Sequence, residues 1–291
     1  MSSSAKIGLG CVTFGREIDE TASFALMDHA HARGVQFFDT AANYAKGASE
    51  LIVGKWLASR RPAPGSLTVA TKIYPPYTPA QIKEAIGRSM ERLGTTALDV
   101  LFLHKWDETA DTPEAMVTLH AAVESGLVRR LGVSNFDLAQ LSKVLGRQAS
   151  LKLHRFQFLQ NNHNVAVRSV DVPLRELCAA EGIAIVTYSP LGAGFLTGKH
   201  KAGVEPGSRF DVMPGHQRIY FTESAMARLA RLEAVAGKSG YTLTQLALGW
   251  ALHHPGVATV LVGGRTPRHL DQAFEALAIE RPDLYAELSA V

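Results

Sequence analysis

The sequence predicts a single (β/α)8 TIM barrel that spans residues 1–291. Eight short apolar or β-branched runs recur along the chain, and segments with apolar residues at helical spacing lie between them. A chain of 291 residues with 46% hydrophobic residues can bury one large core. Eight alternations within one domain favour a closed barrel over an open doubly wound sheet.

The expected strands follow one another in chain order. They begin near residues 7, 35, 67, 98, 130, 155, 183 and 257 and read IGLGC, VQFFD, LTVATK, LDVLFLH, RLGVSN, RFQFLQ, IAIVTYS and VATVLVGG. The spacing of apolar residues predicts helices that include 20–33, 79–93, 112–126 and 171–181. Gly126 and Gly182 are typical helix stops, which let the chain turn back toward the next strand.

One connection breaks this rhythm. Residues 190–220, after the seventh strand, are rich in glycine, proline and basic residues. A connection of this length is typical of a functional loop rather than a plain link. The sequence contains no internal repeat, low-complexity tract or interdomain linker.

Composition excludes several classes of protein. The formal net charge of +3 is too small and too dispersed to indicate a nucleic-acid surface. No apolar stretch has the length of a signal peptide or a membrane span, so we expect a soluble, cytoplasmic protein. Cys11 and Cys178 are the two cysteines, and their local patterns predict no disulfide, in keeping with a reducing compartment. Oligomeric state is not predicted.

Polar residues follow the ends of the expected strands, where the active site of a (β/α)8 barrel lies. They are Asp39, Tyr44, Lys72, His104, Ser134, Asn135, Gln160, Asn161 and Tyr188. Each has an ordinary structural explanation: Asp39 could cap a helix, His104 could be an interior histidine, and Tyr188 could pack in the core. Polar groups at the mouths of six successive strands are costly to bury without partners, so a shared site is the better explanation.

Four of these residues suit one reaction. A phenol such as Tyr44 titrates near 10 in water and can donate a proton. A lysine ammonium beside it is expected to stabilise the phenolate and lower the tyrosine pKa, and a carboxylate keeps that lysine charged and fixed. An imidazole can orient a substrate oxygen. Asp39, Tyr44, Lys72 and His104 could together protonate a carbonyl oxygen while the carbonyl carbon receives a hydride.

These residues lie in motifs that resemble those of the aldo-keto reductases. The segments are DTAANYAKGASE, ATK, LFLHKWD, GVSNF, QNNHN…R and YSPLGAGFLTGK, and the resemblance covers about residues 6–278. It implies a (β/α)8 barrel that binds NADPH without a Rossmann fold and reversibly reduces an aldehyde or ketone. It also implies a catalytic tetrad at Asp39, Tyr44, Lys72 and His104. The resemblance further implies that Tyr44 is the general acid, that Lys72 and Asp39 adjust its pKa, and that His104 orients the carbonyl.

The resemblance also implies which residues bind the cofactor. At the nicotinamide they are Ser134, Asn135 and Gln160, with Tyr188 stacked on the ring. At the pyrophosphate they are Ser189, Leu191, Gly194 and Lys199, and around the adenosine phosphate they are Gly263, Arg265, His269 and Gln272. A guanidinium suits a 2′-phosphate, so NADP(H) is favoured over NAD(H), with Lys199 and Arg209 as further candidates to contact that phosphate.

The chain departs from the family pattern at two positions. His163 stands where the family often has tyrosine, and Ala273 stands where it often has asparagine. Ala273 cannot make the hydrogen bond to adenine that an asparagine side chain can make. We therefore expect weaker cofactor binding without a change of cofactor.

Other classes of enzyme fit less well. A Rossmann fold needs G-x-G-x-x-G after the first strand, but GLGCVT has Thr13 at the last position. Lys72 could form a Schiff base as in an aldolase, yet Asp39 would hold it protonated. The pairs His29/His31 and His253/His254 lack the spacing of metal ligands, and no metal is expected.

The alternative from another class is an NADP(H)-binding regulatory subunit, similar to the β-subunits of channels, which senses redox state. The complete tetrad favours an enzyme. A pocket of Cys11, Phe14, Tyr74, Tyr77 and Trp106 is expected beside it, although Trp106 could equally be barrel packing. Glyoxals, aromatic aldehydes, small ketones and sugar aldehydes all stay open as substrates.

Overall fold

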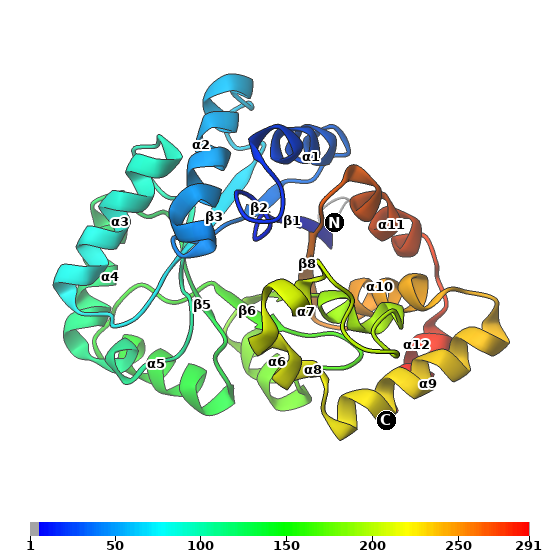
Figure 1. Cartoon of the computed structure of the whole chain (residues 1–291). Helices are drawn as coiled ribbons and strands as arrows, with labels where there is room; N and C mark the ends of the chain where they lie inside the picture. The colour runs from blue at the N-terminus through cyan, green and yellow to red at the C-terminus, as the bar shows by residue number, and fades with distance from the viewer. Residues whose placement is uncertain (1–5, 291) are drawn as a thin grey trace.

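Eight parallel strands close into one barrel, with each strand hydrogen-bonded to its neighbours in chain order (Figure 1). The computed structural model describes residues 6–290. The strands are β1 Ile7–Gly10, β2 Phe37–Asp39, β3 Thr68–Ile73, β4 Val100–Leu103, β5 Leu131–Ser134, β6 Phe158–Asn162, β7 Ala184–Tyr188 and β8 Val257–Gly263. The predicted (β/α)8 fold is confirmed, and all eight strands lie where the apolar runs placed them.

Helices surround the barrel (Figure 1). They are α1 Glu20–Ala32, α2 Ala48–Arg60, α3 Pro79–Leu93, α4 Pro113–Glu124, α5 Leu138–Ser150, α6 Val172–Ala180, α9 Glu223–Ser239, α10 Leu243–His253, α11 Pro267–Leu277 and α12 Pro282–Ser289. Helix α3 has the predicted bounds because its signals are strong. The Thr78 side chain caps its first turn, Pro79 opens it, and Gly94 ends it with a left-handed φ of 64°.

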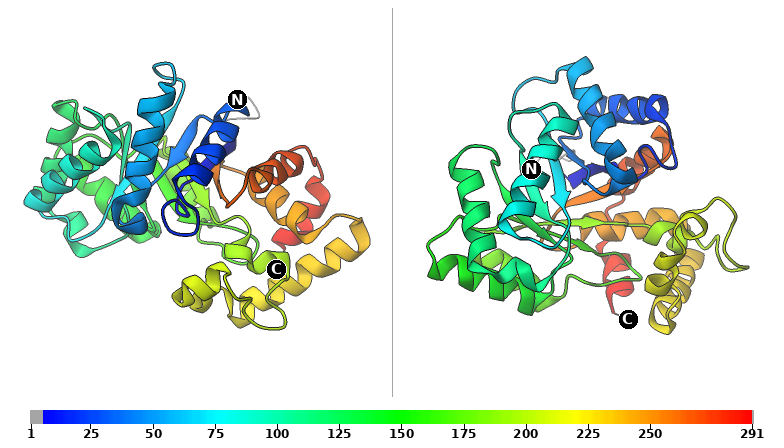
Figure 2. Two further views of the ribbon diagram at one scale, coloured as in Figure 1. Left: turned by 45° about the horizontal axis from the view of Figure 1, so that its top comes forward. Right: turned by 60° about the vertical axis from the view of Figure 1, so that its left-hand side comes forward.

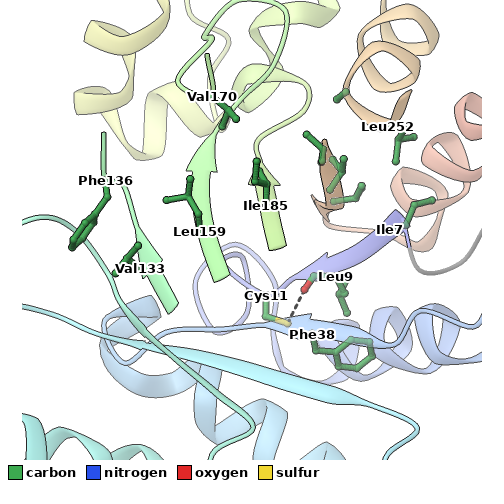
Figure 3. Close-up of a cluster of buried hydrophobic side chains, with 14 of the residues drawn as sticks. Ile7, Leu9, Cys11, Phe38, Val133, Phe136, Leu159, Val170, Ile185 and Leu252 are labelled. Carbon is green, nitrogen blue, oxygen red and sulfur yellow. Dashed lines mark hydrogen bonds between the residues drawn. The ribbon is translucent and has the colours of Figure 1, made fainter. Parts of the chain in front are cut away.

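The barrel interior is filled by side chains, so it is a packed core and not a pore. Phe102 packs there with Ala70 and Val100. Gly132 makes room for the ring, since a Cβ at this position would lie 2.5 Å from the Phe102 Cε1 atom. Figure 3 shows part of a larger apolar cluster, in which Leu159 and other strand residues lie among side chains of neighbouring elements.

The segment 190–220, predicted as a functional loop, also contains short helical turns that the sequence did not indicate. They are η4 Gly192–Thr197, α7 Arg209–Val212, η5 Pro214–His216 and α8 Gln217–Tyr220. Phe195, Phe210 and Tyr220 are fully buried and contact one another through their rings. These rings belong to the main apolar core and so anchor the segment, which lies with α9 on one side of the barrel (Figure 2).

None of the helices within residues 6–290 combines the length and apolar character needed to cross a membrane. The cytoplasmic location stays a prediction.

Candidate active site

The four tetrad residues come together at the carboxyl end of the barrel. Asp39 ends β2, Lys72 lies on β3, and His104 directly follows β4. Tyr44 opens the short helix η2, Tyr44–Gly47, in the connection after β2. Because neighbouring parallel strands end at the same face, residues that are up to 65 positions apart share one site.

Lys72 is the centre of this group. Its ammonium is completely buried and donates to Asp39 Oδ2 at 2.5 Å, to the Thr40 carbonyl at 2.8 Å and to the Tyr44 hydroxyl oxygen at 3.4 Å. Burial lowers the pKa of Lys72 and raises the pKa of Asp39, and the attraction between the two groups opposes both shifts. These contacts hold the ammonium against the phenol oxygen of Tyr44.

Tyr44 differs from the sequence expectation in one respect. Burial raises its pKa well above the ordinary value, and the Asp39 carboxylate adds to this rise. The sequence instead predicts that Lys72 lowers that pKa. Lys72 is paired with Asp39, so the two together present little net charge to the phenol, and desolvation dominates. Tyr44 is therefore protonated at neutral pH, as a proton donor must be.

His104 is neutral at physiological pH. Its pKa falls to about 3, chiefly because the ring is buried and secondly because Lys72 and Lys105 are cations. The ring meets those of Tyr44 and Tyr74 edge to face, with centroids 5.7 and 5.8 Å apart. Its Nδ1 atom is buried without a hydrogen-bond partner among residues 6–290. A neutral imidazole at this place can orient a polar substrate group.

The strand ends next to the tetrad carry the expected nicotinamide residues. Asn135 has a left-handed φ of 59°. Its Nδ2 donates to the His104 carbonyl at 2.9 Å and to Ser134 Oγ at 3.1 Å, and its Oδ1 accepts from the Tyr188 hydroxyl at 2.6 Å. Gln160 instead donates from Nε2 to Asp39 Oδ1 at 2.8 Å, so its amide nitrogen holds the tetrad carboxylate. The sequence did not suggest this contact between Gln160 and Asp39, because 121 positions separate the two residues.

Ser189 directly precedes the segment 190–220, and Leu191, Gly194 and Lys199 lie along its start. Ser189 has a φ of 56° and Gly194 a φ of 96°. A Cβ at Gly194 would lie 3.0 Å from the Lys199 Cε atom, so this glycine lets the lysine pass close to the backbone. The Lys199 ammonium lies 3.5 Å from the Glu205 carboxylate.

Gly263, Arg265, His269 and Gln272 lie at the end of β8 and the start of α11. Arg265 is exposed and donates to the Gly207 carbonyl at 2.7 Å. The ring of His269 contacts the Thr266 hydroxyl at 2.9 Å, and Thr266 gives α11 no side-chain cap. Pro267 has no N–H group and the His269 N–H donates to the Thr266 carbonyl at 3.1 Å, so the helix begins next to Arg265 without a side-chain cap. Ala273, one of the two departures, is fully buried on α11.

The expected substrate pocket is only partly formed. Cys11 and Phe14 have no exposed surface, so they pack behind the site instead of lining it. The Cys11 thiol contacts the Leu9 carbonyl (Figure 3), and burial raises its pKa, which leaves it unreactive. Tyr77 is also buried, with its hydroxyl donating to the Lys105 carbonyl at 2.8 Å. Tyr74, at 51% exposed, and partly exposed Trp106 present surface.

An ion-pair network that sequence reasoning missed ties the segment 190–220 to the barrel. Glu17 is 4% exposed and holds Arg16 Nε and Arg209 Nη1, each at 2.7 Å. Arg209 was a candidate for the 2′-phosphate, but its guanidinium is paired with Glu17. No local pattern could show this, because 192 positions separate the two residues.

A second missed group is a buried carboxylate between helices. Glu50, on α2, has no exposed surface and accepts from Thr71 Oγ1 and Arg92 Nε, each at 2.5 Å. It lies one turn past the η2 segment that carries Tyr44. It therefore fixes the position of the chain that presents the tyrosine.

A closed parallel barrel with ionisable groups gathered at the carboxyl ends of its strands is the architecture of barrel enzymes. The chain belongs to the aldo/keto reductase family, whose family model matches residues 6–285. It is similar to Protein tas of Escherichia coli (strain K12), with 30% identity over 98% of this chain and 93% of the relative. It is also similar to versiconal hemiacetal acetate reductase of Aspergillus parasiticus, with 28% identity over 95% and 90% of the two chains. Norsolorinic acid reductase B of Dothistroma septosporum is 29% identical over 93% and 74%. The protein is thus an oxidoreductase of the kind that acts on carbonyl groups.

Proposed function

We propose that the protein reduces an aldehyde or ketone to an alcohol with NADPH, and that Tyr44 is the general acid. The observation that carries this proposal is the contact of the buried Lys72 ammonium with the Tyr44 hydroxyl oxygen at 3.4 Å. A protonated phenol held by an ammonium is suited to give up its proton to a nearby oxygen. Two of the relatives are named reductases, which supports the direction of the reaction.

Each residue of the tetrad has its own role in the proposed reduction. NADPH, when bound, supplies a hydride to the carbonyl carbon. Tyr44 gives its proton to the carbonyl oxygen, which completes the alcohol and leaves a phenolate. The Lys72 ammonium stabilises that phenolate, and Asp39 and the Thr40 carbonyl hold the ammonium in place. Neutral His104 orients the carbonyl before the transfer.

Two features of the chain fit a phosphate-rich dinucleotide. The first turn of α11 has no side-chain cap and lies beside Arg265, and an uncapped helix N-terminus attracts anions. Ser189 and Ala193 hold left-handed backbone, at φ 56° and 58°, which costs a residue with a side chain about 1 kcal/mol. Strained positions of this kind cluster at ligand sites. These features support NADP(H) bound along β7, the segment after it and α11.

Steady-state oxidation of NADPH, followed by its absorbance, tests the proposal with a panel of glyoxals, aromatic aldehydes, small ketones and sugar aldehydes. We expect saturable oxidation that requires a carbonyl compound and regenerates NADPH in reverse with the product alcohol. Tight binding of NADPH without turnover of any carbonyl compound would instead support the regulatory subunit.

A further inference from the structure

Two histidines and a glutamate meet on the surface away from the tetrad. His120 and Glu124 lie four positions apart on α4, so their side chains share one face of the helix. His154 lies in the connection between α5 and β6 and reaches the same place from 30 positions further along the chain. We call His120, Glu124 and His154 the α4 cluster.

The contacts within the α4 cluster are close. His154 Nε2 lies 2.5 Å from Glu124 Oε1, and the His154 backbone N–H donates to His120 Nδ1 at 3.3 Å. The two imidazole rings have centroids 4.8 Å apart. One ligand atom from each residue lies within 4.8 Å of the other two. Three possible metal ligands from two elements therefore lie close together.

We propose that the α4 cluster binds a divalent transition-metal ion, best matched by Zn²⁺. Two imidazole nitrogens and one carboxylate are a donor set that Zn²⁺ favours, whereas Mg²⁺ and Ca²⁺ favour oxygen ligands. At zinc–ligand distances of about 2.0–2.1 Å, tetrahedral ligands are about 3.3 Å apart. A separation of 4.8 Å would have to shorten by about 1.5 Å, and the 2.5 Å between His154 Nε2 and Glu124 Oε1 would have to lengthen by about 0.8 Å. Side-chain rotations can supply both changes.

The surroundings suit an ion that exchanges with solvent. The His154 side chain is 41% exposed and that of Glu124 is 61% exposed, so a metal can enter and keep water as its fourth ligand. The cluster lies before β5 and β6, at the amino end of the barrel, opposite the tetrad. An ion there would link α4 to the segment before β6 and stabilise the fold without taking part in catalysis.

Sequence reasoning expected no metal, because it compared histidines that are neighbours in the chain. In the structure His29 pairs with Asp271 at 2.8 Å, and His253 contacts the Leu277 carbonyl at 3.1 Å. The α4 cluster differs because its third donor comes from another element. A hydrogen bond between His154 and Glu124 would give their contact without a metal, and titration with Zn²⁺ distinguishes the two.

Isothermal titration calorimetry of the full chain, stripped of metal and carrying no histidine tag, tests the site with ZnCl₂ and MgCl₂. We expect one Zn²⁺ per chain, no Mg²⁺, and weaker Zn²⁺ binding at lower pH, because the ligands must lose protons. His120→Gln and His154→Gln should each weaken binding at least about tenfold, since losing a ligand costs at least as much as losing an outer-shell partner.

His29→Gln is the matched control, because it removes a histidine that contacts Asp271 outside the cluster and should leave Zn²⁺ binding unchanged. A second readout is thermal unfolding, whose midpoint should rise with Zn²⁺ in the parent and in His29→Gln but not in the two cluster variants. Absence of Zn²⁺ binding to the parent would overturn the proposal. Equal binding to the parent and to both cluster variants would overturn it as well.

Discussion

Arg265 is the residue through which we expect the protein to distinguish its two possible cofactors. It is exposed, adjoins the uncapped first turn of α11, and donates to the Gly207 carbonyl at 2.7 Å. That carbonyl is a neutral partner, which a phosphate can replace. A charged hydrogen bond to the 2′-phosphate contributes about 1.5–3 kcal/mol, or about ten- to a hundredfold in affinity.

The variant Arg265→Gln should therefore raise the Kd for NADPH by about ten- to a hundredfold and leave the Kd for NADH unchanged. Titration of protein fluorescence with both cofactors measures this. Arg268→Gln is the matched control, because Arg268 lies three positions from Arg265, in the first turn of α11, and its guanidinium already pairs with Glu275. Equal affinity of the parent for NADPH and NADH would contradict the assignment.

His163 makes stability depend on pH. It is 2% exposed and packs on Trp250 and His254, and its pKa falls to about 3 because of burial first, then His254, and then Arg175 and Arg168. The ordinary value is 6.5. Between these values the unfolded chain binds a proton that the folded chain excludes. Stability is therefore intact above about pH 6.5 and is lost progressively as the pH falls toward about 3.

The variant His163→Asn can keep the hydrogen bond that Nδ1 accepts from the Val170 N–H, and it does not titrate. Loss of the ring should destabilise it at every pH. When the pH is lowered from about 7 to about 5, the parent should nevertheless lose about 2 kcal/mol more unfolding free energy than the variant. Urea unfolding at the two pH values gives this difference, and the same pH dependence in parent and variant would count against the mechanism.

At the scale of elements, α2 and α3 pack unusually closely at Gly54. A Cβ there would lie 2.5 Å from the Arg92 carbonyl oxygen and 2.8 Å from the Leu93 carbonyl carbon, both of which are backbone atoms. Arg92 also pairs with Glu50 of α2 at 2.5 Å. The glycine thus allows the approach that lets this buried ion pair form.

The variant Gly54→Ala should destabilise the protein by about 1–3 kcal/mol, because the two helices must move apart. Gly87→Ala on α3 is the matched control, since its Cβ would meet nothing within 4 Å. It should stabilise the protein by about 0.5–1 kcal/mol, as alanine does in an exposed helix. Urea midpoints followed by circular dichroism measure both changes, and the same sign for the two variants would refute this account.

Elements with strong local signals could be predicted from the sequence, and elements held by distant contacts could not. The strands and α3 follow from apolar periodicity, caps and glycine stops. The turns α7 and α8 have four residues each, too few to show a period. Buried Phe210 and Tyr220 hold them, and no local pattern indicates where those rings pack.

At the scale of the whole molecule, barrel closure brings the site together. Residues at strand ends could be predicted as one cluster because the fold class fixes where strands end. The partners that orient such side chains could not be predicted from the sequence. Examples are the hydrogen bond from Gln160 to Asp39 and the ion pair between Glu17 and Arg209. The burial of Cys11 and Phe14 could not be predicted either, because the sequence does not show which way a loop turns after its strand.

The central claim is that this barrel delivers one proton from Tyr44. Lys72→Met should impair the reaction in the same way as Tyr44→Phe, because both act on that proton. The double variant should then be far less than additive, as expected for residues that work as a unit.

The most direct test is the steady-state rate of carbonyl reduction by Tyr44→Phe with saturating NADPH. The change removes the hydroxyl alone, so NADPH affinity should be unchanged. Both kcat and kcat/KM should fall by about 10²- to 10⁴-fold, because the proton is delivered in the transition state. Tyr241→Phe, which removes a hydroxyl far along the chain on the approach to α10, serves as the control and should keep the parent rate. Near-normal turnover by Tyr44→Phe would contradict the account and would require a different acid.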